Sequence, residues 1–115
     1  MGKQLNKVTG NYGEELAKKY LKKQKYAILE TNYTTKIGEI DIIAKDNDEF
    51  VFIEVKTRNT LFFGLPREAV TPYKQHKIRL VATEYIKTHK LFNEKVRCDV
   101  IEIIENEITH IKNAF

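Results

Sequence analysis

The chain has 115 residues, a length that suits one domain with a single hydrophobic core. Hydrophobic residues make up 42% and charged residues 31%, which is ordinary for a soluble globular protein. No apolar run approaches the ~20 residues of a membrane span, and the first residues lack the apolar segment of a signal peptide. The single cysteine excludes an internal disulfide and a cysteine-based zinc site. We therefore expect one cytoplasmic domain over residues 1–115, without membrane contact.

The net charge of +4 is unevenly distributed along the chain. Residues 1–25 carry seven Lys and two Glu, and residues 67–90 carry six basic and two acidic residues. Residues 26–66 carry four basic and seven acidic residues. An acidic centre between basic segments suits a polyanion held over a metal site. The alternative is that the lysines form the solvated faces of helices.

A first helix is predicted over residues 10–25, because apolar residues recur there at helical spacing. Residues 1–9 lack this periodicity and are expected to form a flexible lead-in. Glu14 lies at the edge of the apolar stripe, where it either reaches over the core towards the sheet or is a favourable acid in the first turns of the helix.

Three strands are predicted next, over residues 26–34, 38–44 and 50–58, where β-branched and aromatic residues are frequent. The polar residues 45–49 between the second and third strands are typical of a turn. The second and third strands are therefore expected to form a hairpin.

Carboxylates stand on both strands of this hairpin. Glu54 and Lys56 share a face because side chains at i and i+2 of a strand point the same way. Asp41 lies between Ile40 and Ile42, which are expected to face the other side. Two carboxylates in apolar surroundings repel each other unless a cation lies between them, and Mg²⁺ prefers such oxygen ligands. The alternative is an exposed hairpin with a solvated Glu54–Lys56 pair.

A loop over residues 59–66 is unusually apolar, and Phe62 and Phe63 are expected to pack in the core or against a second subunit or a nucleic-acid base. A second helix follows, with Thr71 as its N-cap and Pro72 as its first residue.

The start of this second helix is basic, with Lys74, Lys77 and Arg79. These residues either bind phosphate together with the helix N-terminus or form a solvated face. Two further strands are predicted over residues 96–104 and 108–112. The order of helices and strands indicates an α/β sandwich with a mixed sheet.

The segment Gly38-Glu39-Ile40-Asp41, followed after twelve residues by Glu54-Val55-Lys56, resembles the PD-(D/E)xK nuclease motif, with Ile40 in the place of the motif's proline. Together with Gly13-Glu14, Lys74-Gln75 and Cys98-Asp99-Val100, it resembles the bacterial YraN family. Those small proteins are similar to archaeal Holliday-junction resolvases. The resemblance runs from about residue 10 to residue 115.

The resemblance implies a restriction-endonuclease-like αβββαβ core, with a central mixed sheet flanked by two helices. It implies that Asp41, Glu54 and the Val55 carbonyl ligate Mg²⁺ or Mn²⁺, and that Lys56 orients or activates the attacking water. Glu14 would act through a second metal ion or a water. The accessory residue would be Gln75, and the nucleic-acid contacts would be Lys74, Lys77, Arg79 and Arg58.

Three functions remain open from the sequence. The first is a metal-dependent endonuclease that acts on branched or single-stranded DNA. The second is a non-catalytic nucleic-acid binding module of DNA recombination or uptake that keeps the nuclease scaffold. The third is a scaffold that forms a homodimer through the loop of Phe62 and Phe63.

Overall fold

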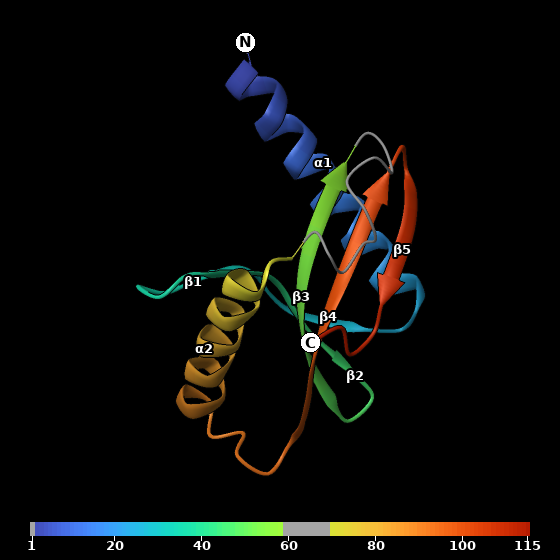
Figure 1. The fold of residues 1–115 in the computed structure, drawn as a ribbon. Coiled ribbons are helices and arrows are strands. Elements are labelled where there is room, and N and C mark those ends of the chain that lie inside the picture. Colours follow the sequence, from blue (N-terminus) through green and yellow to red (C-terminus); the bar gives the residue numbers. More distant parts are fainter. Residues whose placement is uncertain (1, 59–69) are drawn as a thin grey trace.

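The computed structural model describes the backbone of residues 2–58 and 70–115 and the side chains of residues 12–58 and 70–115. Phe62 and Phe63 lie outside these ranges. The sequence predicts that they pack in the core or against a second subunit or a nucleic-acid base. The elements in chain order are α1 (Gly2–Lys23), β1 (Ala27–Thr34), β2 (Glu39–Asp46), β3 (Glu49–Arg58), α2 (Pro72–Thr88), β4 (Lys95–Ile104) and β5 (Glu107–Ile111) (Figure 1).

The strands form one mixed sheet in the order β1-β2-β3-β4-β5. β2 is antiparallel to both β1 and β3, β4 is parallel to β3, and β5 is antiparallel to β4. Because β3 and β4 are parallel, the chain must cross from one end of the sheet to the other between them, and α2 lies in that crossover. The predicted α/β fold with a restriction-endonuclease-like order of elements is confirmed.

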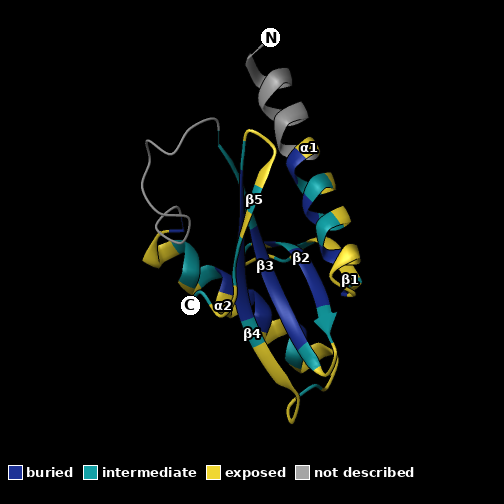
Figure 2. Ribbon diagram, turned by 90° about the vertical axis from the view of Figure 1, so that its right-hand side faces the viewer, coloured by how far each residue is buried: buried dark blue, intermediate teal, exposed yellow. Residues whose placement is uncertain are grey.

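The two helices cover opposite faces of the sheet (Figure 2). Under α1, Leu21 packs in one cluster with Ile53, and under α2, Val81 packs in another with Phe52. β3 contributes to both clusters because its successive side chains point to opposite faces. Among the described residues, neither helix is both long and apolar enough to cross a membrane.

The first helix begins at Gly2, so the predicted start at residue 10 is wrong. No proline occurs between residues 2 and 9, and nothing there interrupts the backbone hydrogen bonds of a helix. Apolar periodicity reports the part of a helix that packs on a core, and the sequence of residues 2–9 lacks that pattern.

The predicted N-cap of α2 is confirmed. The Thr71 hydroxyl accepts a hydrogen bond from the backbone N–H of Lys74 at 3.2 Å, and Pro72 occupies the first turn. This cap fixes where the basic start of α2 lies relative to the sheet.

The β2–β3 hairpin is confirmed, but its ladder is shorter than β2. The last pair is Ile42 with Ile53, whereas β2 continues to pair with β1 as far as Glu39. Ile40 packs under α2 and Ile42 under α1, so the prediction that both face one side is wrong. Asp41 lies where β2 continues beyond its last pair with β3.

Helix α1 lies very close to the end of β3. A Cβ atom added at Gly13 would lie 2.0 Å from the Thr57 Oγ1 atom. Real Cβ atoms do not approach so closely, so a larger residue would displace the helix or turn Thr57. Gly13 therefore sets the distance at which its neighbour Glu14 stands from the sheet.

Candidate active site

Asp41 is held against β3 by a backbone hydrogen bond. Its Oδ2 atom accepts the N–H of Val55 at 2.8 Å, just beyond the last pair of the β2–β3 ladder. This side chain thus replaces the backbone partner that Val55 would have had in a continuing ladder. The half-buried carboxylate is brought beside Glu54, the neighbour of Val55 on β3.

Glu54 is buried, with 4% of its surface exposed. Within the described part of the chain, its Oε2 atom has no hydrogen-bond partner. The Nζ atom of Lys74 lies 3.4 Å from that oxygen, within the range of an ion pair. Lys74 is 45% exposed, so solvent weakens this pair. A buried carboxylate oxygen that lacks a hydrogen bond is costly unless a ligand satisfies it.

The two carboxylates perturb each other. Burial raises the pKa of the Asp41 carboxyl to about 8, and a hydrogen bond with Glu54 and the repulsion from its charge act in the same direction. The Val55 N–H and Lys74 oppose this shift and do not cancel it. One proton, or one cation, is therefore favoured between Asp41 and Glu54 at neutral pH.

The pair suits a small divalent cation. Mg²⁺ is commonly bound through one or two carboxylates and completes its octahedral shell with water and substrate phosphate. Among the described residues, no group of three or more His, Cys, Asp or Glu side chains is close enough to hold a metal ion. Asp41 and Glu54 are the two carboxylates that such an ion would use as side-chain ligands, and the Glu54 Oε2 atom accepts no hydrogen bond from the residues that the structure describes and lies 3.4 Å from Lys74 Nζ.

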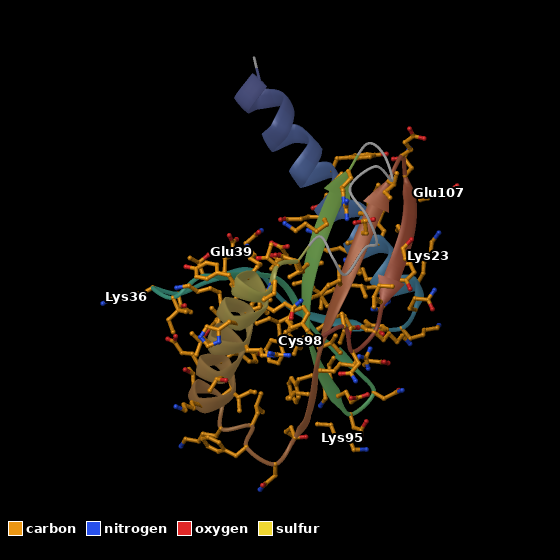
Figure 3. All side chains as sticks on the ribbon, viewed as in Figure 1. Lys23, Lys36, Glu39, Lys95, Cys98 and Glu107 are labelled. Carbon is orange, nitrogen blue, oxygen red and sulfur yellow. The ribbon has the colours of Figure 1, made fainter. Side chains whose placement is uncertain are left out.

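Glu14 lies on α1 within electrostatic range of this pair. Burial raises the pKa of its carboxyl, and Asp41 and Glu39 raise it further, while a hydrogen bond from Asn32 opposes the shift. The Asn32 Nδ2 atom donates to Glu14 Oε2 at 3.3 Å, so β1 steadies this side chain. Glu39 is exposed at the start of β2, and Figure 3 shows Lys36 at the outer tip of the preceding turn.

Lys56 and Arg58 follow Glu54 along the same face of β3. Lys56 is half-buried and stands opposite Glu102 in the parallel ladder. Arg58 forms an ion pair with Glu102, which is fully buried. The structure thus places the Arg58 side chain against a buried acid of β4, whereas the lysines of α2 have other partners. Sequence reasoning missed Glu102, although an acid between the apolar residues of a strand was a visible signal.

The basic residues of α2 contact different partners. Lys74 reaches the acid pair, Lys77 lies over the ring of Tyr73, and Arg79 lies over the ring of Phe115.

Gln75, on the same first turns, donates from Nε2 to the Val70 carbonyl at 2.9 Å. Its side chain therefore stabilises the start of α2 in this structure.

The sequence profile described as "Uncharacterised protein family UPF0102" matches residues 13–103. The chain is a member of the UPF0102 family. It is 50% identical over 112 residues to a UPF0102 protein of Clostridioides difficile, a match that covers 96% of this chain and 98% of the relative. A UPF0102 protein of Syntrophomonas wolfei is 43% identical over 115 residues, with 96% and 100% covered. The resemblance to the YraN family, a PD-(D/E)xK nuclease-like family, is confirmed.

The range matched by the UPF0102 profile contains the three acids and the lysine predicted as catalytic, Glu14, Asp41, Glu54 and Lys56, and it ends before β5. β5 contributes to a different buried cluster, under α1. Asp99, fully buried, accepts hydrogen bonds from Arg97 Nε at 3.1 Å, from His110 Nε2 at 2.7 Å and from the Asn113 N–H at 2.9 Å. Tyr20 completes the cluster, because its hydroxyl lies 3.0 Å from His110 Nδ1.

The hydrogen atoms of this cluster can be placed consistently. If His110 Nε2 carries the proton that Asp99 accepts, the neutral Nδ1 accepts the Tyr20 hydroxyl. Burial alone would raise the pKa of Asp99, but hydrogen bonds from His110, Arg97 and Asn113 outweigh it and hold the pKa below its ordinary value. The cluster is a satisfied structural network, unlike the acid pair under α2.

Proposed function

We propose that this UPF0102 protein hydrolyses phosphodiester bonds of nucleic acid with the help of Mg²⁺ or Mn²⁺ at Asp41 and Glu54. The observation that carries the proposal is the pair itself. Glu54 is buried with an oxygen that lacks a hydrogen bond, and its neighbour Asp41 has a pKa raised to about 8. Such perturbed groups are typical of functional sites.

The chain's own residues would have distinct tasks. Asp41 and Glu54 hold the cation, and the backbone bond to Val55 keeps Asp41 in position. When bound, the ion would polarise the phosphoryl oxygen and activate water for in-line attack. Lys56, two residues from Glu54 on the same face, would orient the attacking water and offset phosphate charge. Glu14 would add a further negative charge on the α1 side.

The substrate would reach this site along the basic start of α2. Lys74 and Lys77 are positioned there, and each phosphate that a lysine neutralises releases counterions and adds affinity. We propose branched or single-stranded DNA as this substrate.

A second candidate function is a nucleic-acid binding module that keeps the scaffold without catalysis. The observation that favours it is the Lys74–Glu54 ion pair, in which a side chain supplies the cation that a metal would otherwise supply. In this case Lys74 would offset part of the negative charge of the acid pair in the working protein, and no metal would be required.

Calorimetric titration with Mg²⁺ and Mn²⁺ separates the two candidates. The wild type should bind the metal ions, and Glu54→Ala should weaken their affinity at least about tenfold, since one of two carboxylate ligands is removed. Glu84→Ala, which removes an exposed acid of α2, is the matched control and should bind as the wild type does.

The same proteins should then be assayed for metal-dependent cleavage of branched, flapped and single-stranded DNA. Equal metal affinity in the wild type and Glu54→Ala would reject the proposed metal site. Metal binding without cleavage of any of these substrates would favour the binding module.

A further inference from the structure

A large aromatic side chain is exposed beside the acid pair. Tyr73 lies in the first turn of α2 and is 70% exposed, more than any of the other large hydrophobic residues described as exposed. Its neighbour along the chain is Lys74, whose ammonium reaches Glu54. Exposed tyrosines at the edge of a site often contact ligands, because the ring is apolar and rigid and its tip is polar.

Tyr73 and Lys77 form one unit on the surface of α2. They are four residues apart, so they lie on the same face of the helix, and the Lys77 Nζ atom is 5.5 Å from the centre of the Tyr73 ring. Lys74 lies between this unit and the sheet. Within two turns, the helix therefore presents an aromatic ring, two ammonium groups and the approach to a buried carboxylate.

This combination matches the chemistry of a nucleic-acid strand with unpaired bases. Ammonium groups bind the phosphates of any strand, paired or not. An aromatic ring stacks on a base only when the base is free of its own stack, as in single strands, flaps and the unpaired parts of branched molecules. A ring without neighbouring cations would favour a protein partner, and cations without a ring would not distinguish single strands from duplex.

We propose that Tyr73 stacks on an unpaired base next to the phosphate that Lys74 and Lys77 bind, so that the site selects strands with unpaired bases. The inference rests on the proposed function, since it takes the acid pair as the place where the phosphate is cut. Tyr73 is assigned as a specificity-determining residue and not as a catalytic one. Its ring fixes which nucleotide lies over Asp41 and Glu54.

The test is the affinity of the whole chain for three fluorescent probes in EDTA, where metal-dependent cleavage cannot occur. The probes are an oligothymidine, an oligonucleotide of equal length with abasic sites, and a duplex of equal length. Tyr73→Ala should weaken binding of oligothymidine about five- to a hundredfold, the range expected for one stacked base. Binding of the abasic strand and the duplex should change little.

Two further variants control this measurement. Tyr73→Phe keeps the ring and should bind as the wild type does. Phe92→Ala removes another exposed aromatic, 67% exposed and located beyond the other end of α2, and should also leave binding unchanged. Circular dichroism of each variant shows that the fold is intact.

The inference is overturned if Tyr73→Ala binds oligothymidine as tightly as the wild type does, or if it loses affinity equally for all three probes. It is equally overturned if the wild type binds none of them. The metal titration is independent of this result, because Tyr73→Ala should bind Mg²⁺ as the wild type does. Stacking without metal binding would reject the nuclease and retain the selection of unpaired bases.

Discussion

Asp99 and Asp41 are acids of one sheet, and they differ in the hydrogen-bond donors and the charges around them. Asp99, under α1, receives hydrogen bonds from Arg97, His110 and the Asn113 backbone, and its pKa lies below the ordinary value. Asp41 receives one backbone hydrogen bond, from Val55, and faces a second carboxylate, so its pKa is raised to about 8. Asp99 is surrounded by hydrogen-bond donors, whereas Asp41 faces the negative charge of Glu54.

The difference separates a group that stabilises the fold from one that the fold must tolerate. Donors that satisfy a buried carboxylate make its charged form part of the native structure. A carboxylate placed against another raises the free energy of the folded state until a proton or cation joins them. Natural proteins retain such strain at sites that bind ligands.

The largest effect is expected at Asp99. Asp99→Asn should destabilise the fold by about 1.5–3 kcal/mol, because His110 would lose its buried anionic acceptor, whereas Arg97 would keep its ion pairs with Asp46 and Glu49. Urea unfolding at pH 7 measures this change. Asp48→Asn, at an exposed acid paired with Lys95, is the control and should unfold like the wild type. A loss as small as that of the control would show that the cluster is not structural.

The opposite sign is expected at Asp41. Asp41→Asn should stabilise the fold by about 1 kcal/mol or more in EDTA at pH 7, since relief of one pKa unit is worth about 1.4 kcal/mol. The shape is kept, and the Asn oxygen can still accept the Val55 N–H. Added Mg²⁺ should stabilise the wild type more than the variant. A variant less stable than the wild type in EDTA would make Asp41 a structural acceptor like Asp99.

The pH dependence of stability distinguishes the two acids further. The folded pKa of Asp41 lies above its unfolded value of 3.8, so the folded state binds more protons, and stability falls as pH rises from about 4 to about 8. The folded pKa of Asp99 is lowered, so its contribution is present above pH 3.8 and is lost as pH falls. In EDTA, Asp41→Asn should therefore flatten the fall in stability between about pH 4 and about pH 8 and leave the loss below pH 3.8 unchanged. Thermal unfolding between about pH 2 and about pH 9 measures this profile, and a changed loss below pH 3.8 would contradict the assignment.

The smallest effect is expected at Lys74. Lys74→Met removes the ammonium that competes with a metal ion for Glu54 and should tighten Mg²⁺ binding about two- to fivefold, as suits a pair that is partly exposed. Lys77→Met is the control. It removes an ammonium that lies over Tyr73 and should leave the metal affinity unchanged. Weaker metal binding in Lys74→Met would mean that Lys74 supports the site instead of competing for it.

The strands and the β2–β3 hairpin were predictable because they depend on alternation and turn residues that are local in the sequence. The approach of Asp41 to Glu54 followed from that hairpin. The ion pairs of Lys74 with Glu54 and of Arg58 with Glu102 were not predictable. They depend on where α2 docks and on the register of the parallel β3–β4 pair, and neither is encoded in any short segment.

The distance along the chain between paired strands also determines the sequence of folding steps. β1, β2 and β3 follow one another and pair through short turns, whereas β3 and β4 must close a loop that contains α2. Closing the longer loop costs more chain entropy, so the hairpin should form first and the parallel pair last. The environment that raises the pKa of Asp41 includes Glu54 on β3 and Lys74 on α2, so it is complete only when α2 is in place. The stability gained by Asp41→Asn should therefore appear as slower unfolding, with little change in the rate of folding.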